Sequence, residues 1–134
     1  MWSDVSPLST FPLLYVHDKV IHLGQSLYKV YGWNVSLALI CGDASVWKPA
    51  QTTPLCAIAT NKIIVRVLQE NGYPGAISAL ICGGGEVGAA LVSSDEVDLI
   101  SFTGSEARGR LVSMEAAGKF KQSLLELGGN NVSF

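Results

Sequence analysis

Short apolar runs recur along the chain from residue 44 onward, and Gly, Pro or Asp residues separate them. Four of these runs are too continuously apolar for a solvated sheet face and are predicted to be strands, at residues 44–48, 76–82, 97–102 and 122–127. Apolar strands that alternate with helices form a parallel sheet with helices on both faces. The pattern therefore predicts an α/β fold with a βαβαβαβ core over residues 44–127.

Three helical patterns connect these strands. The first begins after Thr53, which can cap it, with Pro54 at the first helical position, and it ends at Gly72. Its apolar residues recur at helical spacing and fall near one helical face: Leu55, Ile58, Ala59, Ile63, Val67 and Leu68. The other two helices are predicted over residues 86–92 and residues 105–117, the latter with Ser105 as its cap.

The first 29 residues have no comparable pattern. Pro7 and Pro12 interrupt the start, and residues 13–23 fit a strand or a helix equally well. Residues 36–41 likewise fit either the end of a helix or a strand. We expect residues 1–29 to be a separate segment that packs poorly against the rest.

Composition excludes several classes of function. The 134 residues are about one domain by length, 49% hydrophobic and 15% charged. A net charge of −2 without a basic patch does not favour nucleic acid, and no apolar run is long enough to span a membrane. No targeting signal is legible, so we expect a cytoplasmic or mitochondrial protein.

The cysteines and histidines do not form a recognisable site. Cys41, Cys56 and Cys82 lack C-x-x-C spacing, which favours free, half-buried thiols in a reducing compartment. His17 and His22 lie in the poorly patterned region, and no metal site is predicted.

Two segments near the C-terminus are suited to chemistry. Thr103, Gly104 and Ser105 follow a predicted strand and open a helix, which gathers free backbone N–H groups at the positive end of a helix dipole. That setting suits a phosphate, although good capping alone would also explain it. Glu126 stands in an apolar strand end just before Gly128 and Gly129, and a carboxylate held there is a candidate general base.

Two further segments are ambiguous. Residues 83–88 (GGGEVG) match the G-x-G-x-x-G pattern after a strand, but no acidic residue ends the next strand. A tight strand–helix turn is the favoured interpretation there, and a phosphate loop or a looser role near a cofactor are the alternatives. Lys48 ends a strand where a nucleotide ribose would lie, or it is simply a solvated lysine.

Over residues 30–134 these motifs together resemble the NAD-dependent aldehyde dehydrogenases. The resemblance rests on the segments Trp-Lys-Pro, Phe-Thr-Gly-Ser and Glu-Leu-Gly-Gly, in that order. Within the family, Glu-Leu-Gly-Gly-Asn-Asn and Tyr-Gly-Trp-Asn look closest to the antiquitin branch, which oxidises α-aminoadipic semialdehyde. The implied fold is an incomplete, Rossmann-like NAD-binding domain, and the parent enzyme is expected to be a homo-oligomer.

The resemblance also implies roles for individual residues. Lys48 would bind the adenosine ribose of NAD, Gly104 and Ser105 the diphosphate, and the Leu127 backbone would lie near the nicotinamide. Glu126 would be the base that activates water. The family often has a Glu three residues after the Lys, where this chain has Gln51, which leaves the choice between NAD and NADP open.

The implied reaction needs a cysteine that this sequence does not supply. In the family a thiolate attacks a small-molecule aldehyde, hydride passes to nicotinamide, and the activated water releases a carboxylate. The nucleophile follows the Glu, whereas all three cysteines here precede Glu126.

Asn34 lies too close to Lys48 to be the family's oxyanion donor, and Gln25 stands at that position instead. We therefore expect a fragment that is inactive alone. The alternative is a non-catalytic nucleotide-binding or regulatory module that pairs with full-length subunits.

Overall fold

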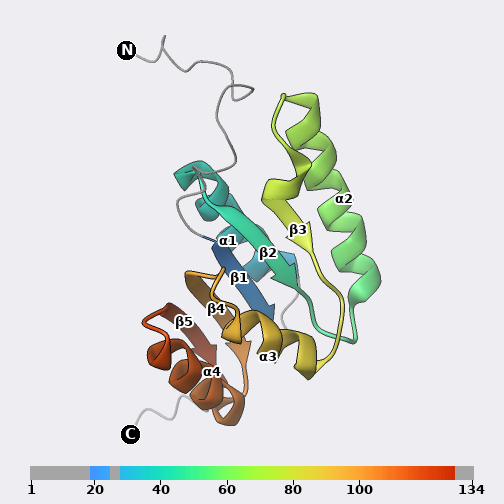
Figure 1. The fold of residues 1–134 in the computed structure, drawn as a ribbon. Coiled ribbons are helices and arrows are strands. Elements are labelled where there is room, and N and C mark those ends of the chain that lie inside the picture. Colours follow the sequence, from blue (N-terminus) through green and yellow to red (C-terminus); the bar gives the residue numbers. More distant parts are fainter. Residues whose placement is uncertain (1–18, 25–27, 129–134) are drawn as a thin grey trace, which may run out of the picture.

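One parallel sheet organises the molecule (Figure 1), which is described from a computed structural model covering residues 19–24 and 28–128. Its strands are β1 (Lys19–Gly24), β2 (Ala44–Lys48), β3 (Ser78–Leu80), β4 (Leu99–Gly104) and β5 (Gln122–Leu127). They lie in the order β3-β2-β1-β4-β5, and every neighbouring pair is parallel. The predicted α/β fold class is confirmed.

Helices cover both faces of this sheet (Figure 1). The helices are α1 (Tyr28–Cys41), α2 (Pro54–Glu70), α3 (Gly85–Ser93) and α4 (Glu106–Gly118), and a short 3-10 helix spans Gly75–Ile77. Residues from α1 and α2 pack on β2 in one core, whereas residues from α3 and α4 pack on β4 in another. Successive strand residues point to opposite faces, so Ile100 enters the second core while Ser101 faces α1.

Two strands differ in extent from their predictions. The strand predicted over residues 76–82 is limited to Ser78–Leu80, because the chain forms a 3-10 turn just before it. The strand predicted over residues 97–102 begins and ends two residues later, at Leu99–Gly104. Apolar character marked these strands correctly but did not define their ends, since flanking turn residues such as Val97 are also buried.

The expectation that residues 1–29 pack poorly is wrong for Lys19–Gly24. These residues form β1, the central strand, which pairs with β2 through Ile21 and Val46 and with β4 through Ile21 and Ile100. The open choice for residues 13–23 thus resolves to a strand where they are described. Residues 36–41, also left open, belong to helix α1.

Helix α2 begins where the sequence indicates but buries a different face. Thr53 occupies the N-cap position without a capping hydrogen bond from its side chain, and Pro54 is the first helical residue. Leu55, Ile63 and Val67 are exposed, while Ala57 is buried and Ile64 packs beside it. The predicted apolar face is therefore wrong in part, because α2 is apolar around most of its circumference and hydrophobicity alone did not select the buried side.

Strand β5 forms one edge of the described sheet. Leu124 and Leu127 are exposed, and Glu126 between them is exposed as well. The apolar surroundings expected for Glu126 are therefore not present among the described residues. Within the same residues, no helix is both long enough and apolar enough to cross a bilayer.

Candidate functional site

The sequence-predicted site residues lie at the carboxyl edge of the sheet. Lys48 is the last residue of β2, Gly104 the last of β4 and Leu127 the last of β5. The strand register places Lys48 opposite Leu23, and Leu127 opposite Gly104. Three strand spacings separate β2 from β5, or about 14 Å. In open parallel sheets ligands bind at this edge, where the strand order reverses, which is here between β1 and β4.

Lys48 is held at the end of β2 by its neighbours. Its side chain is partly buried, and Nζ donates a hydrogen bond to the carbonyl of Pro49 at 3.1 Å. Trp47, just before it, is buried and stacks on Tyr31 with ring centroids 3.7 Å apart. An ammonium group has three donors, so this contact leaves two for a ligand hydroxyl or phosphate.

Gly104 and Ser105 connect β4 to α4 in a tightly packed turn. A Cβ atom at Gly104 would lie 2.6 Å from Cζ of Phe102, so the packing of that ring favours glycine here. The Gly104 carbonyl accepts a hydrogen bond from the N–H of Gly128 at 3.0 Å, which joins this turn to the end of β5.

Ser105 is the N-cap of α4, as predicted. Its Oγ accepts a hydrogen bond from the N–H of Arg108 at 3.4 Å. The N–H groups of the first helical residues, Glu106 and Ala107, have no acceptor within the helix and point out of its end. The Glu106 carboxylate pairs with Arg110 at 2.7 Å, which offsets its negative charge at this helix end. The turn can therefore hold an anion through backbone groups.

Glu126 and Leu127 are positioned by their pairing with β4. Glu126 lies opposite Thr103 in the register, and its carboxylate is exposed at the sheet edge. The Leu127 side chain packs against Gly109 of α4, where a Cβ atom would lie 2.3 Å from Cδ2 of Leu127. Gly109 was not among the predicted residues, although a glycine within a helix is a signal for close packing.

The GGGEVG segment forms a tight strand–helix turn, which was the favoured interpretation. Its helix, predicted over residues 86–92, is α3 and begins one residue earlier, at Gly85. Oε1 of Glu86 accepts a hydrogen bond from the N–H of Gly84 at 3.0 Å. A carboxylate of the protein itself thus occupies the place where a phosphate loop would offer a free N–H group.

A buried polar network behind Lys48 was not predicted. The Tyr31 hydroxyl of α1 lies 3.1 Å from Oγ of Ser78 on β3, and Ser78 donates to Oδ1 of Asn61 on α2 at 3.2 Å. Burial raises the pKa of Tyr31, which keeps its hydroxyl protonated. The network therefore joins α1, α2 and β3 around the buried strand β2. A polar residue within an apolar strand, such as Ser78, was the signal in the sequence.

The other candidate residues do not join the site. Asn34 donates from Nδ2 to Oγ of Ser101 at 3.1 Å, a contact that fixes α1 on β4 and agrees with giving Asn34 no oxyanion role. Gln25, Gly129, Asn130 and Asn131 lie outside the described residues. All three cysteines are free but exposed, so the expectation of half-buried thiols is wrong. Across residues 19–24 and 28–128, no group of three metal-ligating side chains gathers.

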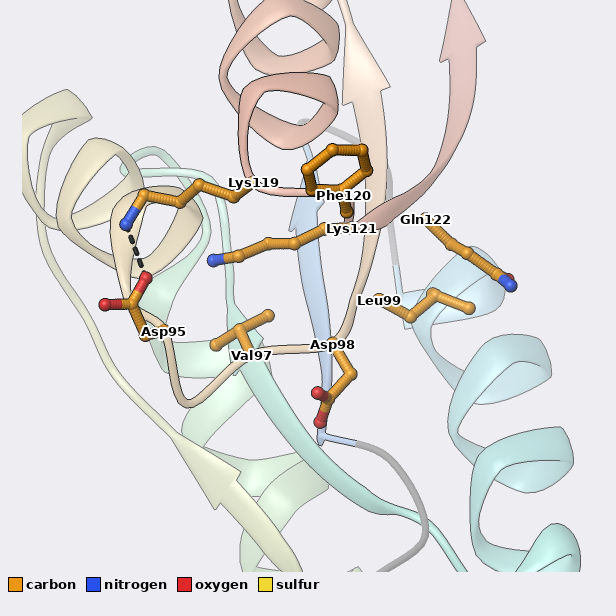
Figure 2. Close-up of a pocket in the computed structure, with 8 residues that line it drawn as sticks. All are labelled: Asp95, Val97, Asp98, Leu99, Lys119, Phe120, Lys121 and Gln122. Atoms are coloured by element: carbon orange, nitrogen blue, oxygen red, sulfur yellow. Dashed lines mark hydrogen bonds and ion pairs between the residues drawn. The ribbon is translucent and has the colours of Figure 1, made fainter.

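A hollow of about 390 Å³ lies at the opposite edge of the sheet, where β4 and β5 begin (Figure 2). Lys119 binds Asp95 across it at 2.5 Å. Lys121 donates to the carbonyls of Val92 and Ser94 at the end of α3. Both ammonium groups are thus already engaged in holding α3 and α4 together, and the hollow is a structural junction rather than part of the candidate site.

Comparison with known proteins identifies the family. A sequence model described as the aldehyde dehydrogenase family matches residues 28–134. The chain belongs to the aldehyde dehydrogenase family. It is 52% identical to alpha-aminoadipic semialdehyde dehydrogenase from Bos taurus and 50% identical to the protein of the same name from Rattus norvegicus. Each match covers 76% of this chain but only 19% of the relative, so the chain spans about a fifth of these proteins.

Solved structures of the family share the same fold. Betaine aldehyde dehydrogenase from Staphylococcus aureus in complex with NAD+ matches with a TM-score of 0.72 and 34% identity, over 84% of this chain and 22% of that one. Glyceraldehyde-3-phosphate dehydrogenase from Methanocaldococcus jannaschii, complexed with NADP, matches with a TM-score of 0.75 and 31% identity, over 84% and 25%. The expected resemblance to aldehyde dehydrogenases, and to their semialdehyde branch, is confirmed.

Proposed function

We propose that residues 30–134 form part of the NAD-binding domain of an NAD-dependent aldehyde dehydrogenase. The observation that carries the proposal is the common location of Lys48, Gly104, Ser105 and Glu126 at one edge of the sheet. A dinucleotide extended along this edge can reach from β2 to β5. NAD supplies the hydride acceptor when bound, and the residues of this chain hold and orient it.

Each residue has a distinct part in this proposal. Lys48 donates to hydroxyls of the adenosine ribose, and the turn at Gly104 and Ser105 holds the diphosphate through backbone N–H groups. The Leu127 backbone lies beside the nicotinamide. The exposed carboxylate of Glu126 accepts a proton from the water that releases the acid. The small-molecule substrate is an aldehyde, with α-aminoadipic semialdehyde proposed from the relatives, and the parent enzyme is a homo-oligomer.

The polypeptide of these 134 residues is proposed to bind NAD without oxidising aldehydes. Its three thiols all precede Glu126 in the sequence and lie on α1, on α2 and just after β3. None is placed at the ends of β4 or β5, where the base and the proposed nicotinamide position are. Orientation of cofactor and base does not replace a covalent nucleophile.

Calorimetric titration of the purified chain with NAD tests the binding proposal. Lys48→Ala should weaken NAD binding by about tenfold, the worth of one charged hydrogen bond at a partly exposed site. Lys62→Ala, which removes an equal charge from an exposed position on α2, should leave binding unchanged. Equal losses in both variants, or no NAD binding by the unchanged chain, would refute the proposed site.

Absorbance of NADH in the presence of α-aminoadipic semialdehyde tests the absence of turnover. No NADH should form above background with the 134-residue polypeptide. Turnover that disappears in Glu126→Gln would show that one of the three exposed cysteines acts as nucleophile. NAD binding together with capture of a full-length aldehyde dehydrogenase subunit would favour the alternative, a regulatory module.

A further inference from the structure

Two loops meet at Gly84, beside the proposed ribose position. The N–H of Ile81 donates to the carbonyl of Trp47 at 2.9 Å, so β2 and β3 leave the sheet side by side. Three residues beyond Lys48, Nε2 of Gln51 lies 2.9 Å from the point where a Cβ atom on Gly84 would stand. Both carboxylate oxygens of Glu86 lie close to the same point, at 2.4 and 2.7 Å. Gln51 and Glu86 are therefore neighbours across the two loops.

Gln51 stands where the family often has a glutamate, so the β2 loop has no acidic group beside the ribose. Glu86 of α3 places one there from the adjacent loop. Glu86 is exposed, and its hydrogen bond to the N–H of Gly84 holds the carboxylate against the turn. A negative charge is thus present beside Gln51. It comes from the connection between β3 and α3, not from the connection between β2 and α2 that carries Gln51.

We infer that Glu86 makes the chain select NAD over NADP, an inference that rests on the proposed function. The two cofactors differ at the 2′ position of the adenosine ribose, which carries a hydroxyl in NAD and a phosphate in NADP. A carboxylate accepts a hydrogen bond from the hydroxyl, whereas it repels a phosphate monoester of charge about −2. Glu86 also accepts the hydrogen bond of the Gly84 N–H, so this donor is not free to bind a phosphate. The similar structure of glyceraldehyde-3-phosphate dehydrogenase is complexed with NADP. The fold alone therefore does not decide between NAD and NADP.

Titration of the full 134-residue chain with NAD and NADP separately tests this inference. The unchanged chain should bind NAD more tightly. Glu86→Gln removes the charge but keeps an oxygen that can accept from Gly84, and it should strengthen NADP binding relative to NAD by about tenfold. Glu115→Gln removes the same charge from an exposed position on α4 and should leave the ratio unchanged.

Ionic strength gives a second readout that needs no folded variant. Raising salt from about 0.05 M to about 0.5 M screens charge repulsion, so the preference of the unchanged chain for NAD should narrow. A preference that does not respond to salt, or a ratio that Glu86→Gln leaves unchanged while both cofactors bind, would overturn the role of Glu86. Failure of the unchanged chain to bind either cofactor would instead refute the proposed function itself.

Discussion

Replacement of Tyr31 by phenylalanine tests whether the buried polar network stabilises the fold behind Lys48. The Ser78 hydroxyl has one hydrogen, and it donates that hydrogen to Asn61. Tyr31 must therefore donate to Ser78, across 3.1 Å. Tyr31→Phe removes this donor but keeps the ring, which continues to stack on Trp47. The change removes the hydroxyl, which also hydrogen-bonds Ser45, without opening a cavity.

The expected cost is worked from the bond to Ser78. A neutral buried hydrogen bond contributes about 1 kcal/mol to the free energy of unfolding. An unfolding entropy of about 2.1 cal/mol/K per residue, applied to a chain of 134 residues, converts this cost to a fall in Tm of about 4 °C. Ser78→Ala also removes the bond to Asn61 and should cost about 2 kcal/mol.

Thermal unfolding followed by circular dichroism measures both changes. Tyr73→Phe, at an exposed tyrosine, is the matched control and should leave Tm unchanged. The double variant of Tyr31 and Ser78 should be less destabilised than the sum of the two single variants, because one bond is shared. Strict additivity, or a Tm for Tyr31→Phe equal to that of the unchanged chain, would show that the two hydroxyls do not interact.

Two further predictions concern the second core and the junction at the opposite sheet edge. Ile100 is 0% exposed, so Ile100→Ala should lower the free energy of unfolding by about 2–5 kcal/mol in urea titrations, while Ile40→Ala, at a position 85% exposed, should have little effect. The hydrogen bond and charge of Lys119 lower the pKa of Asp95 from 3.8, so the folded chain keeps this carboxylate ionised where the unfolded chain protonates it. Its stabilising contribution is complete above pH 3.8 and is lost as pH falls through the lower, folded pKa. Asp95→Asn should therefore show a smaller loss of stability on acidification; an identical acid profile would contradict the pairing.

The sequence predicted the alternation of strands and helices because apolar runs and turn residues are local signals. Ser105 was identifiable as a cap and Ala44–Lys48 as a strand for this reason. The buried side of α2 was not predictable, since exposed Leu55 is more hydrophobic than buried Ala57 and only tertiary packing decides which of them is covered.

The candidate site was predicted from motifs, and its supporting contacts were not. The location of Glu86 beside Gln51 depends on how two loops distant in sequence meet, which spacing does not encode. The same limit applies to β1. Its residues, Lys19–Gly24, include Lys and His and lack the apolar continuity of the other strands, so their central place in the sheet depends on partners far along the chain.

The central position of β1 has a consequence for how the chain folds. Strands β2 and β3 lie on one side of it and β4 and β5 on the other, so β1 is the only described strand that joins the two pairs. Its pairing of Ile21 with Ile100 closes a very long loop, and such non-local pairing slows folding. Without β1, the described strands would form two separate two-stranded units, and units of that size are marginally stable in water. Completion of the sheet therefore depends on Lys19–Gly24, a segment that precedes the region matched by the family.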